Sequence, residues 1–122
     1  MATIRDVMTS ELVTVEPGTT VAEAATVMGE RHVGSALVLG DGRMVGIFTE
    51  RDILKALASD FDAARHAVEQ WMTPDPATIA ADAGVREARD LMLERGFRHL
   101  PVTDGEDVVG IVSLRDLSRS DS

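Results

Sequence analysis

The feature of this sequence that most constrains its fold is an internal repeat with an offset of 64 residues. The segment VGIFTERD at positions 45–52 returns as VGIVSLRD at positions 109–116. Aligning residues 7–54 with residues 71–118 without a gap gives 15 identities in 48 positions, where roughly 3 are expected from average residue usage. A duplication of this extent predicts two units that share one fold.

Hydrophobic spacing predicts the same order of elements in both halves. In the first half, apolar residues from Val21 to Met28 recur with the spacing of one buried helix face. Thr20 and Glu23 fit a capping box at the start of that helix. The expected elements of the first half are a helical turn at 3–8, strands at 12–15, 36–39 and 44–48, and helices at 21–31 and 49–59.

The last helix of the first half is expected to bury Ile53, Leu54 and Leu57. A further helix, capped by Asp62 and running to about Gln70, is expected in the joint between the halves. The order of elements then recurs. The expected elements of the second half are strands at 78–79, 100–102 and 108–112, and helices at 85–95 and 113–119.

Each half therefore has the order β-α-β-β-α. The predicted fold class is a mixed α/β protein, more specifically α+β. The halves are predicted to be residues 1–60 and residues 61–122. A unit of about 50 residues buries too little surface to be stable alone. The two repeats are therefore expected to pack on one another about a pseudo-twofold axis, as one globular module.

Composition and charge argue against several classes of function. The net charge is −9, which opposes binding to nucleic acid because phosphate contacts need clustered Lys and Arg. No run approaches the length of about 18 apolar residues that a membrane span needs. The N-terminus also lacks an apolar signal region, so a cytoplasmic protein without membrane contact is expected.

The sequence has no constellation typical of catalysis or metal binding. There is no cysteine, and His32, His66 and His99 lack a metal-ligand spacing. No serine has histidine and aspartate partners in a recognisable order, and there is no glycine-rich phosphate loop. We therefore expect neither an enzyme nor a metal site, and no required cofactor.

Each half does contain a hydroxyl residue followed three positions later by an aspartate, at the start of its last helix. These pairs are Thr49 with Asp52 and Ser113 with Asp116. The pattern fits a helix capping box, which stabilises a helix by about 1 kcal/mol and needs no ligand. It also fits a ligand site, because a helix N-terminus attracts phosphate and a carboxylate can accept hydrogen bonds from both hydroxyls of a ribose. The residues alone leave both interpretations open.

The ordered series of motifs resembles a cystathionine-β-synthase (CBS) domain, and its two copies resemble a tandem CBS pair, or Bateman module. The resemblance rests on Met-Thr before the first strand, PGTTVAEA at 17–24, the buried strand with its turn, and VGIFTERD at 45–52, and it covers residues 3–118. It implies a stand-alone regulatory module that binds an adenosine-containing ligand such as AMP, ADP, ATP, NAD or S-adenosylmethionine. It also implies a disk-like homodimer of pairs and an effector protein that the sequence does not identify.

The resemblance further implies two nucleotide sites, each combining residues of both halves. In the family the aspartate binds ribose, the hydroxyl residue lies near phosphate, and loop segments surround the adenine. The site of Asp52 is expected to include Thr49, Ile47, Arg51, Ala77, Arg98 and His99. The site of Asp116 is expected to include Ser113, Ile111, Arg115, Val13, Val33 and Gly34.

The two sites are expected to differ in charge. Arg98 and His99 are the best local cations for phosphate, with arginines at the starts of the last helices as alternatives, and Gly34 and Ser35 stand at the equivalent positions of the first half. The preferred interpretation is an adenine-nucleotide sensor that acts through a partner protein. The alternative is a ligand-free dimerisation or assembly module, in which both aspartates only cap helices.

Overall fold

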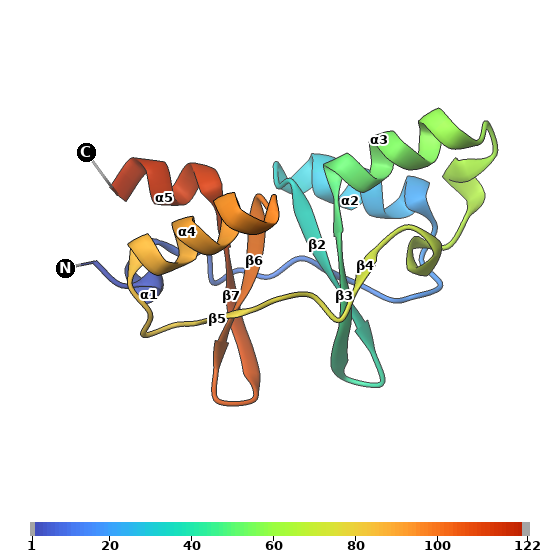
Figure 1. The fold of residues 1–122 in the computed structure, drawn as a ribbon. Helices are drawn as coiled ribbons and strands as arrows, with labels where there is room; N and C mark the ends of the chain where they lie inside the picture. Colours follow the sequence, from blue (N-terminus) through green and yellow to red (C-terminus); the bar gives the residue numbers. More distant parts are fainter. Residues whose placement is uncertain (1, 121–122) are drawn as a thin grey trace. The chain divides into compact units, whose positions relative to one another are not determined.

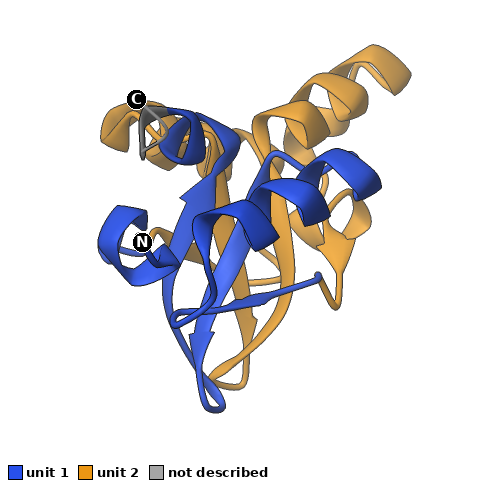
Figure 2. Ribbon diagram, turned by 60° about the vertical axis from the view of Figure 1, so that its left-hand side comes forward, with its two compact units in different colours: residues 1–12, 77–122 blue, residues 13–76 orange. Residues whose placement is uncertain are grey.

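The computed structural model of the chain, which describes residues 2–120, is a mixed fold of helices and two β-sheets (Figure 1). It divides into two compact units, which do not coincide with the two repeats (Figure 2). Unit 1 comprises Met1–Leu12 and Ala77–Ser122, and unit 2 comprises Val13–Pro76. Each unit thus combines the body of one repeat with the segment that leads into the other. The boundary between residues 60 and 61 stays a prediction about the duplication, whereas the compact units follow from how the chain packs.

Unit 2 contains a four-stranded sheet with two α-helices and a connecting segment. Its elements are β1 (Thr14–Val15), α2 (Val21–Arg31), β2 (Ser35–Gly40), β3 (Arg43–Thr49), α3 (Glu50–Ser59), the 3₁₀ turns η1 (Ala63–Arg65) and η2 (Val68–Gln70), and β4 (Thr73–Pro74). The strand order is β1-β2-β3-β4. Strand β1 runs parallel to β2, and β3 is antiparallel to both β2 and β4. The β2–β3 turn points away from helices α2 and α3 (Figure 1).

The core of unit 2 is formed by one face of α2 and the inner residues of the sheet. Val21, Ala24 and Met28 of α2 are buried and pack in one cluster with Val38 of β2 and Phe48 of β3. The predicted helix at 21–31 is confirmed. Its predicted capping box is also present, because the N–H of residue 23 donates to the Thr20 hydroxyl at 3.1 Å and the N–H of Thr20 donates to the residue 23 carboxylate at 3.1 Å.

Of the three residues predicted to be buried on α3, Ile53 packs against the unit 2 cluster, but the prediction was wrong for Leu54 and Leu57. Leu54 is 71% exposed and Leu57 is 49% exposed, while Asp52 and Ala56 are the buried residues of the helix. Asp52 and Ala56 lie on the side of α3 that faces its own unit, and Leu54 and Leu57 lie on the side that faces outward. Apolar spacing locates a stripe on a helix, but it does not say whether the stripe faces the helix's own unit or the outside.

The helix predicted between Asp62 and Gln70 was also wrong. Two 3₁₀ turns, η1 and η2, stand in its place, and Asp62 makes no side-chain cap. The segment between the turns is extended because it bonds to the body of the unit. The N–H of Val21 donates to the carbonyl of His66 at 2.9 Å, and the N–H of Val68 donates to the carbonyl of Thr19 at 2.8 Å. These bonds replace the ones that a continuous helix would have made.

Unit 1 repeats this plan with a three-stranded sheet. Its elements are α1 (Ile4–Val7), β5 (Ile79–Ala80), α4 (Val85–Arg95), β6 (His99–Asp104), β7 (Asp107–Ser113) and α5 (Leu114–Ser120). The strand order is β5-β6-β7, with β5 parallel to β6 and β6 antiparallel to β7. The core cluster includes Met92 of α4, Leu100 of β6, Val112 of β7 and Leu117 of α5. The predicted α+β class is confirmed.

The N-terminal segment is part of the core of unit 1, although it precedes the other repeat. Ile4 is fully buried in the unit 1 cluster, and its N–H donates to the carbonyl of Ala83 at 2.9 Å. Thr9 and Ile111 exchange two backbone hydrogen bonds, each 2.9 Å long. In unit 2 the matching residue, 64 positions after Ile4, is Val68, which is fully buried in the unit 2 cluster, and Trp71 packs against the same cluster.

The Met-Thr pair of each repeat lies over a glycine of the other repeat. A Cβ built on Gly46 of β3 would lie 2.9 Å from the carbonyl oxygen of Thr73 and would meet the sulfur of Met72. A Cβ on Gly110 of β7 would lie 2.9 Å from the carbonyl oxygen of Thr9 and would meet the sulfur of Met8. The close backbone approach explains why these glycines and methionines occur in both repeats. Strand β4, which sequence patterning did not predict, is part of this contact.

Candidate functional site

The start of α3 is a capping box whose acid is buried. The N–H of Thr49 donates to Oδ2 of Asp52 at 2.9 Å, and the Thr49 hydroxyl lies 3.2 Å from the same oxygen. In return, the N–H of Asp52 donates to the Thr49 hydroxyl at 3.3 Å. Asp52 is 8% exposed. The hydrogen bonds of the cap are made to Oδ2 of Asp52. The other carboxylate oxygen, Oδ1, takes no part in the cap.

The chain before β2 lies against the same helix start. The N–H of Glu50 donates to the carbonyl of Gly34 at 3.0 Å, and Ser35 pairs with Thr49 across the hairpin. Val33 packs against the core of unit 2. Val33 and Gly34, which were predicted as site residues, therefore lie beside the first capping box in the same unit.

Val13 and Ile47 are connected through one residue of β2. Leu37 pairs with Ile47 in the β2–β3 hairpin, and its N–H donates to the carbonyl of Val13 at 2.9 Å. Arg51 is exposed in the first turn of α3. Unit 2 thus brings together the predicted site residues Val13, Val33, Gly34, Ile47, Thr49, Arg51 and Asp52.

Unit 1 has the equivalent arrangement at the start of α5. The N–H of Ser113 donates to Oδ2 of Asp116 at 2.9 Å, and the N–H of Asp116 donates to the Ser113 hydroxyl at 3.1 Å. The N–H of Leu114 donates to the carbonyl of Arg98 at 2.9 Å, and His99 pairs with Ser113 in the β6–β7 hairpin. Arg98 and His99 therefore lie beside the second capping box.

One backbone bond differs between the units. In unit 2 the N–H of Leu37 donates to Val13, but the equivalent residue of unit 1 is Pro101, which has no N–H to donate. The carbonyl of Ala77 therefore cannot receive the equivalent bond. Pro101 still pairs with Ile111 through the β6–β7 hairpin. The N-termini of α3 and α5 therefore have the same kind of cap. They differ in the neighbouring strand, where β2 has Leu37 and β6 has Pro101.

The predicted crossed sites combine residues of different compact units. The resemblance assigns Ala77, Arg98 and His99 to the site of Asp52, and it assigns residues 13, 33 and 34 to the site of Asp116. This assignment stays a prediction. What the structure describes is one group of predicted residues around each capping box, with Arg115 exposed in the first turn of α5.

Burial distinguishes Asp52 from Asp6 and Glu23, which complete capping boxes of the same kind. Asp6 and Glu23 are exposed acids in the same kind of box, and hydrogen bonds from Thr3 and Thr20 lower their pKa values. Burial has the opposite effect on Asp52 and raises its pKa above the ordinary value of 3.8, despite the hydrogen bonds from Thr49.

The raised pKa has a consequence for stability. An acid whose pKa is raised by folding stabilises the fold at pH values below its unfolded pKa, and this stabilisation is lost as the pH rises through the folded pKa. At pH values above its raised folded pKa, the charged carboxylate of Asp52 is therefore held buried at a cost in stability. A cap alone does not require that burial, because Asp6 and Glu23 form the same box at the surface.

Three further observations bear on function. A cavity of about 660 Å³ lies at the hairpin-turn end of the unit 2 sheet, lined by residues 14–17 and 39–42, and none of the predicted site residues lines it. Among the residues that the structure describes, no group of three or more His, Asp or Glu could hold a metal ion. Within the same part of the chain, every helix is too short or too polar to cross a membrane.

Comparison with known proteins identifies the family. The family model of the CBS domain matches residues 4–59 and again residues 68–122. The chain belongs to the CBS domain family and contains two copies in tandem, as the resemblance predicted.

Similar proteins include one sequence relative and two solved structures that contain bound ligands. An uncharacterized 17.7 kDa protein of Acidianus ambivalens is 44% identical over 124 residues, which are 98% of this chain and 74% of that protein. The CBS domain pair of protein MJ0100, in complex with 5′-methylthioadenosine and S-adenosyl-L-methionine, has a TM-score of 0.90 and 28% identity, and the match covers 99% of this chain and 96% of that one. CBSX2 in complex with AMP has a TM-score of 0.84 and 28% identity, with coverage of 99% and 96%.

Proposed function

We propose that this protein is a regulatory module that binds an adenosine-containing ligand and acts through a partner protein. The observation that carries the proposal is the burial of Asp52 in a capping box that would function equally well at the surface. Hydrogen bonds from ligand hydroxyls would offset the cost of burying the carboxylate. The same geometry recurs at Asp116, which supports a second site of the same kind.

Two similar proteins support the choice of ligand class. MJ0100 was crystallised with 5′-methylthioadenosine and S-adenosyl-L-methionine, and CBSX2 with AMP. These three ligands share the adenosine moiety and differ in what is attached at the 5′ carbon. We therefore assign adenosine recognition to this chain, with Asp52 and Asp116 as acceptors for ribose hydroxyls. Backbone groups near Val13, Gly34 and Ala77 would contact the base.

The groups that would meet the 5′ substituent are the hydroxyls and cations near the helix starts. The hydroxyls of Thr49 and Ser113 lie at the first turns of α3 and α5. The candidate cations for a phosphate are Arg51, Arg98, His99 and Arg115. The role is regulatory, with no catalysis by the module itself. The cytoplasmic location stays a prediction.

A thermal-shift screen tests the proposal directly. The panel is AMP, ADP, ATP, NAD, S-adenosylmethionine and 5′-methylthioadenosine, with GMP as a control for the base. A ligand at about 100 times its Kd stabilises the protein that it binds by about 2.7 kcal/mol, which corresponds to a rise in Tm of roughly 10 °C. Calorimetry on each hit then gives the affinity. An unchanged Tm with every adenosine compound would favour the ligand-free assembly module.

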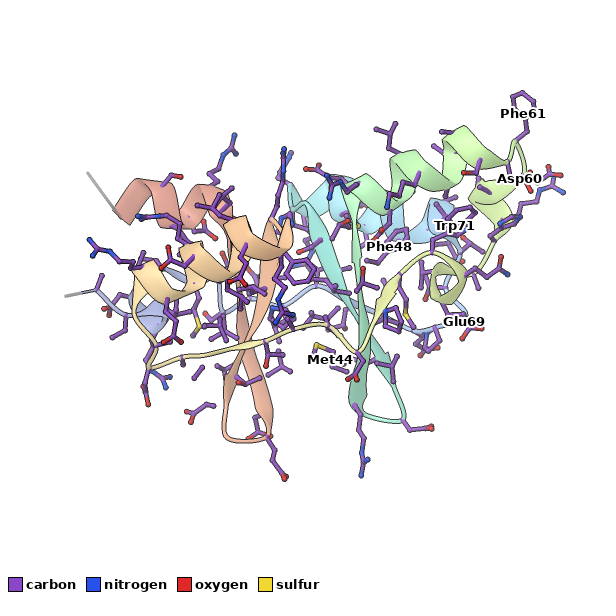
Figure 3. All side chains as sticks on the ribbon, in the orientation of Figure 1. Met44, Phe48, Asp60, Phe61, Glu69 and Trp71 are labelled. Atoms are coloured by element: carbon purple, nitrogen blue, oxygen red, sulfur yellow. The ribbon has the colours of Figure 1, made fainter. Side chains whose placement is uncertain are left out.

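We also propose that the protein forms a homodimer through the outer face of α3. This face, the α3 patch, consists of Leu54, Leu57 and Phe61, and Phe61 is fully exposed beyond the end of the helix (Figure 3). Arg51 lies at the start of the patch and Asp60 at its end. Two α3 helices packed antiparallel about a twofold axis would bury both patches and place these opposite charges near each other.

Replacing Leu54 by glutamate is expected to convert the dimer into a monomer, because it places a charge in the centre of the buried patch. Light scattering at a fixed protein concentration measures the result. Leu93→Glu is the matched control, since Leu93 is a similarly exposed leucine on α4 of the other unit. A dimer that survives Leu54→Glu but is lost in Leu93→Glu would show that the contact is on α4 instead.

A further inference from the structure

The segment that connects the two repeats is fixed to unit 2 by a small polar network around His66. Nε1 of Trp71 donates a hydrogen bond to Nδ1 of His66 at 3.2 Å. The two rings stack with a centroid distance of 6.1 Å and an angle of 12°. On its other side, Nε2 of His66 lies 3.6 Å from Oδ2 of Asp60. Figure 3 labels Asp60 at the end of α3 and Trp71 in the connecting segment.

This geometry requires a neutral imidazole. Nδ1 of His66 accepts the indole N–H, so it carries no proton, and the single ring proton is on Nε2, facing Asp60. In the imidazolium form both ring nitrogens are donors. Nδ1–H would then meet the N–H of Trp71, donor against donor, and the hydrogen bond would be lost. The contact of Nε2 with the Asp60 carboxylate would be strengthened by the new charge.

The charged groups around His66 determine which of its two side-chain contacts is kept when the ring is protonated. From α3, the carboxylate of Asp60 faces the ring, and its other oxygen accepts the N–H of Asp62 at 2.8 Å, which holds it in place. From α2, the backbone N–H of Val21 binds the His66 carbonyl, and the first-turn acid, Glu23, is held by Thr20. A protonated His66 therefore keeps a partner at Asp60 and loses one at Trp71.

Trp71 connects this network to the sheet. It packs against the core cluster of unit 2 and is followed directly by Met72, whose sulfur covers Gly46. The next residue, Thr73, pairs with Ile47 of β3. A change in how Trp71 is held therefore acts on the strand that contains a predicted site residue.

We propose that His66 is a proton-sensitive latch on the segment between the two repeats: neutral His66 holds Trp71 against unit 2, and protonated His66 releases it while staying at Asp60. The proposal does not depend on ligand binding. Histidine is the side chain that ordinarily changes charge between about pH 5 and pH 8, and this sets the pH range of the test.

The single tryptophan of the chain gives a direct readout in the intact protein. Fluorescence and the one indole N–H resonance in a ¹H–¹⁵N spectrum are recorded from about pH 8 to pH 5. The expected result is a red shift of the emission and a movement of the indole resonance on acidification, with native far-UV circular dichroism throughout. An emission and a resonance that stay constant, or a simultaneous loss of the circular dichroism signal, would overturn the proposal.

Two variants isolate His66 from the other titrating groups. His66→Gln keeps a carbonyl oxygen that can accept the indole N–H but does not titrate, so the acid-induced change should disappear. His32→Asn removes an exposed histidine at the left-handed C-cap of α2, where φ is +57°, a conformation that asparagine tolerates, so the change should persist. A response that persists in His66→Gln would refute the latch.

If His66→Gln fails to fold, the wild-type protein still decides the question. The imidazole ¹⁵N resonances of His66 and the indole resonance of Trp71 are then followed through the same titration. Coincident midpoints support the latch, and an indole transition with a different midpoint from that of His66 contradicts it.

Discussion

Replacing Gly46 by alanine is expected to destabilise the protein by about 1–3 kcal/mol, the usual range for a methyl group forced into a packed site. The new Cβ would lie 2.9 Å from the carbonyl oxygen of Thr73. The flexible tip of Met72 can move aside, but the Thr73 carbonyl belongs to β4, which is paired with β3 at this point. At about 4 °C per kcal/mol, Tm should fall by roughly 4–12 °C in a thermal melt.

The repeat provides a second site for the same experiment. Gly110→Ala should cost a similar amount, because its Cβ would lie 2.9 Å from the carbonyl of Thr9, and the N–H of Ile111 donates to that carbonyl. Equal losses at the two positions are expected although they lie in different compact units.

Gly29→Ala is the matched control. Gly29 lies in the exposed part of α2, and a Cβ there would meet nothing within 4 Å. Alanine in a helix is favoured over glycine by about 0.5–1 kcal/mol, so this variant should melt slightly higher than the wild type. If Gly46→Ala were as stable as Gly29→Ala, β4 would not lie over β3 as the structure describes.

The repeat made most of the fold predictable, because each half supported the assignment of the other. The helix at 21–31 and the strand pair around the 40–42 turn follow from local signals, namely apolar spacing, the Thr20 cap and turn glycines. Strand β4 could not be predicted in this way. It has two residues and forms through pairing with a strand of the preceding repeat, and only the recurrence of Met-Thr with Val-Gly-Ile hinted at a contact.

The two capping boxes were predictable from the sequence, but their environment was not, and the assignment of a ligand site to them stays a prediction. Sequence spacing located the capping boxes of Asp52 and Asp116, and both are present with short hydrogen bonds. Spacing cannot report burial, and burial is what separates Asp52 from the otherwise similar Glu23. The exposure of Leu54 was missed for the same reason, since an apolar stripe looks alike whether it faces a core or a partner.

Asp52→Ala and Asp116→Ala are expected to weaken binding of the adenosine ligand by roughly 10-fold to 150-fold, as each removes charged hydrogen bonds worth about 1.5–3 kcal/mol. Calorimetry with the best ligand of the thermal-shift panel measures the change. If both sites bind ligand, each variant should raise the Kd at one of the two sites. If a single site binds, only the variant of that site should show a higher Kd. Both variants also lose part of a helix cap, so a control for the cap is needed.

Glu23→Ala supplies that control. Glu23 completes the box of α2 by the same pattern of hydrogen bonds, but it is exposed and lies outside the predicted site. Its loss should lower stability slightly, because it removes the surface hydrogen bond from the N–H of Thr20, and should leave the Kd within about twofold. An equal loss of affinity in Glu23→Ala and Asp52→Ala would mean that Asp52 acts on binding only through the stability of its helix.

Asp52→Asn separates the two roles of Asp52 most sharply. Asparagine keeps an oxygen that can accept the N–H of Thr49, so the cap is preserved, and it removes the charge whose burial raises the pKa. Because a raised pKa means that the charged form costs stability above that pKa, the variant should be at least as stable as the wild type at neutral pH. It should nevertheless bind the ligand more weakly, since it has one acceptor oxygen instead of two. A less stable variant with unchanged affinity would make Asp52 a structural cap and remove the main support for the proposed ligand site.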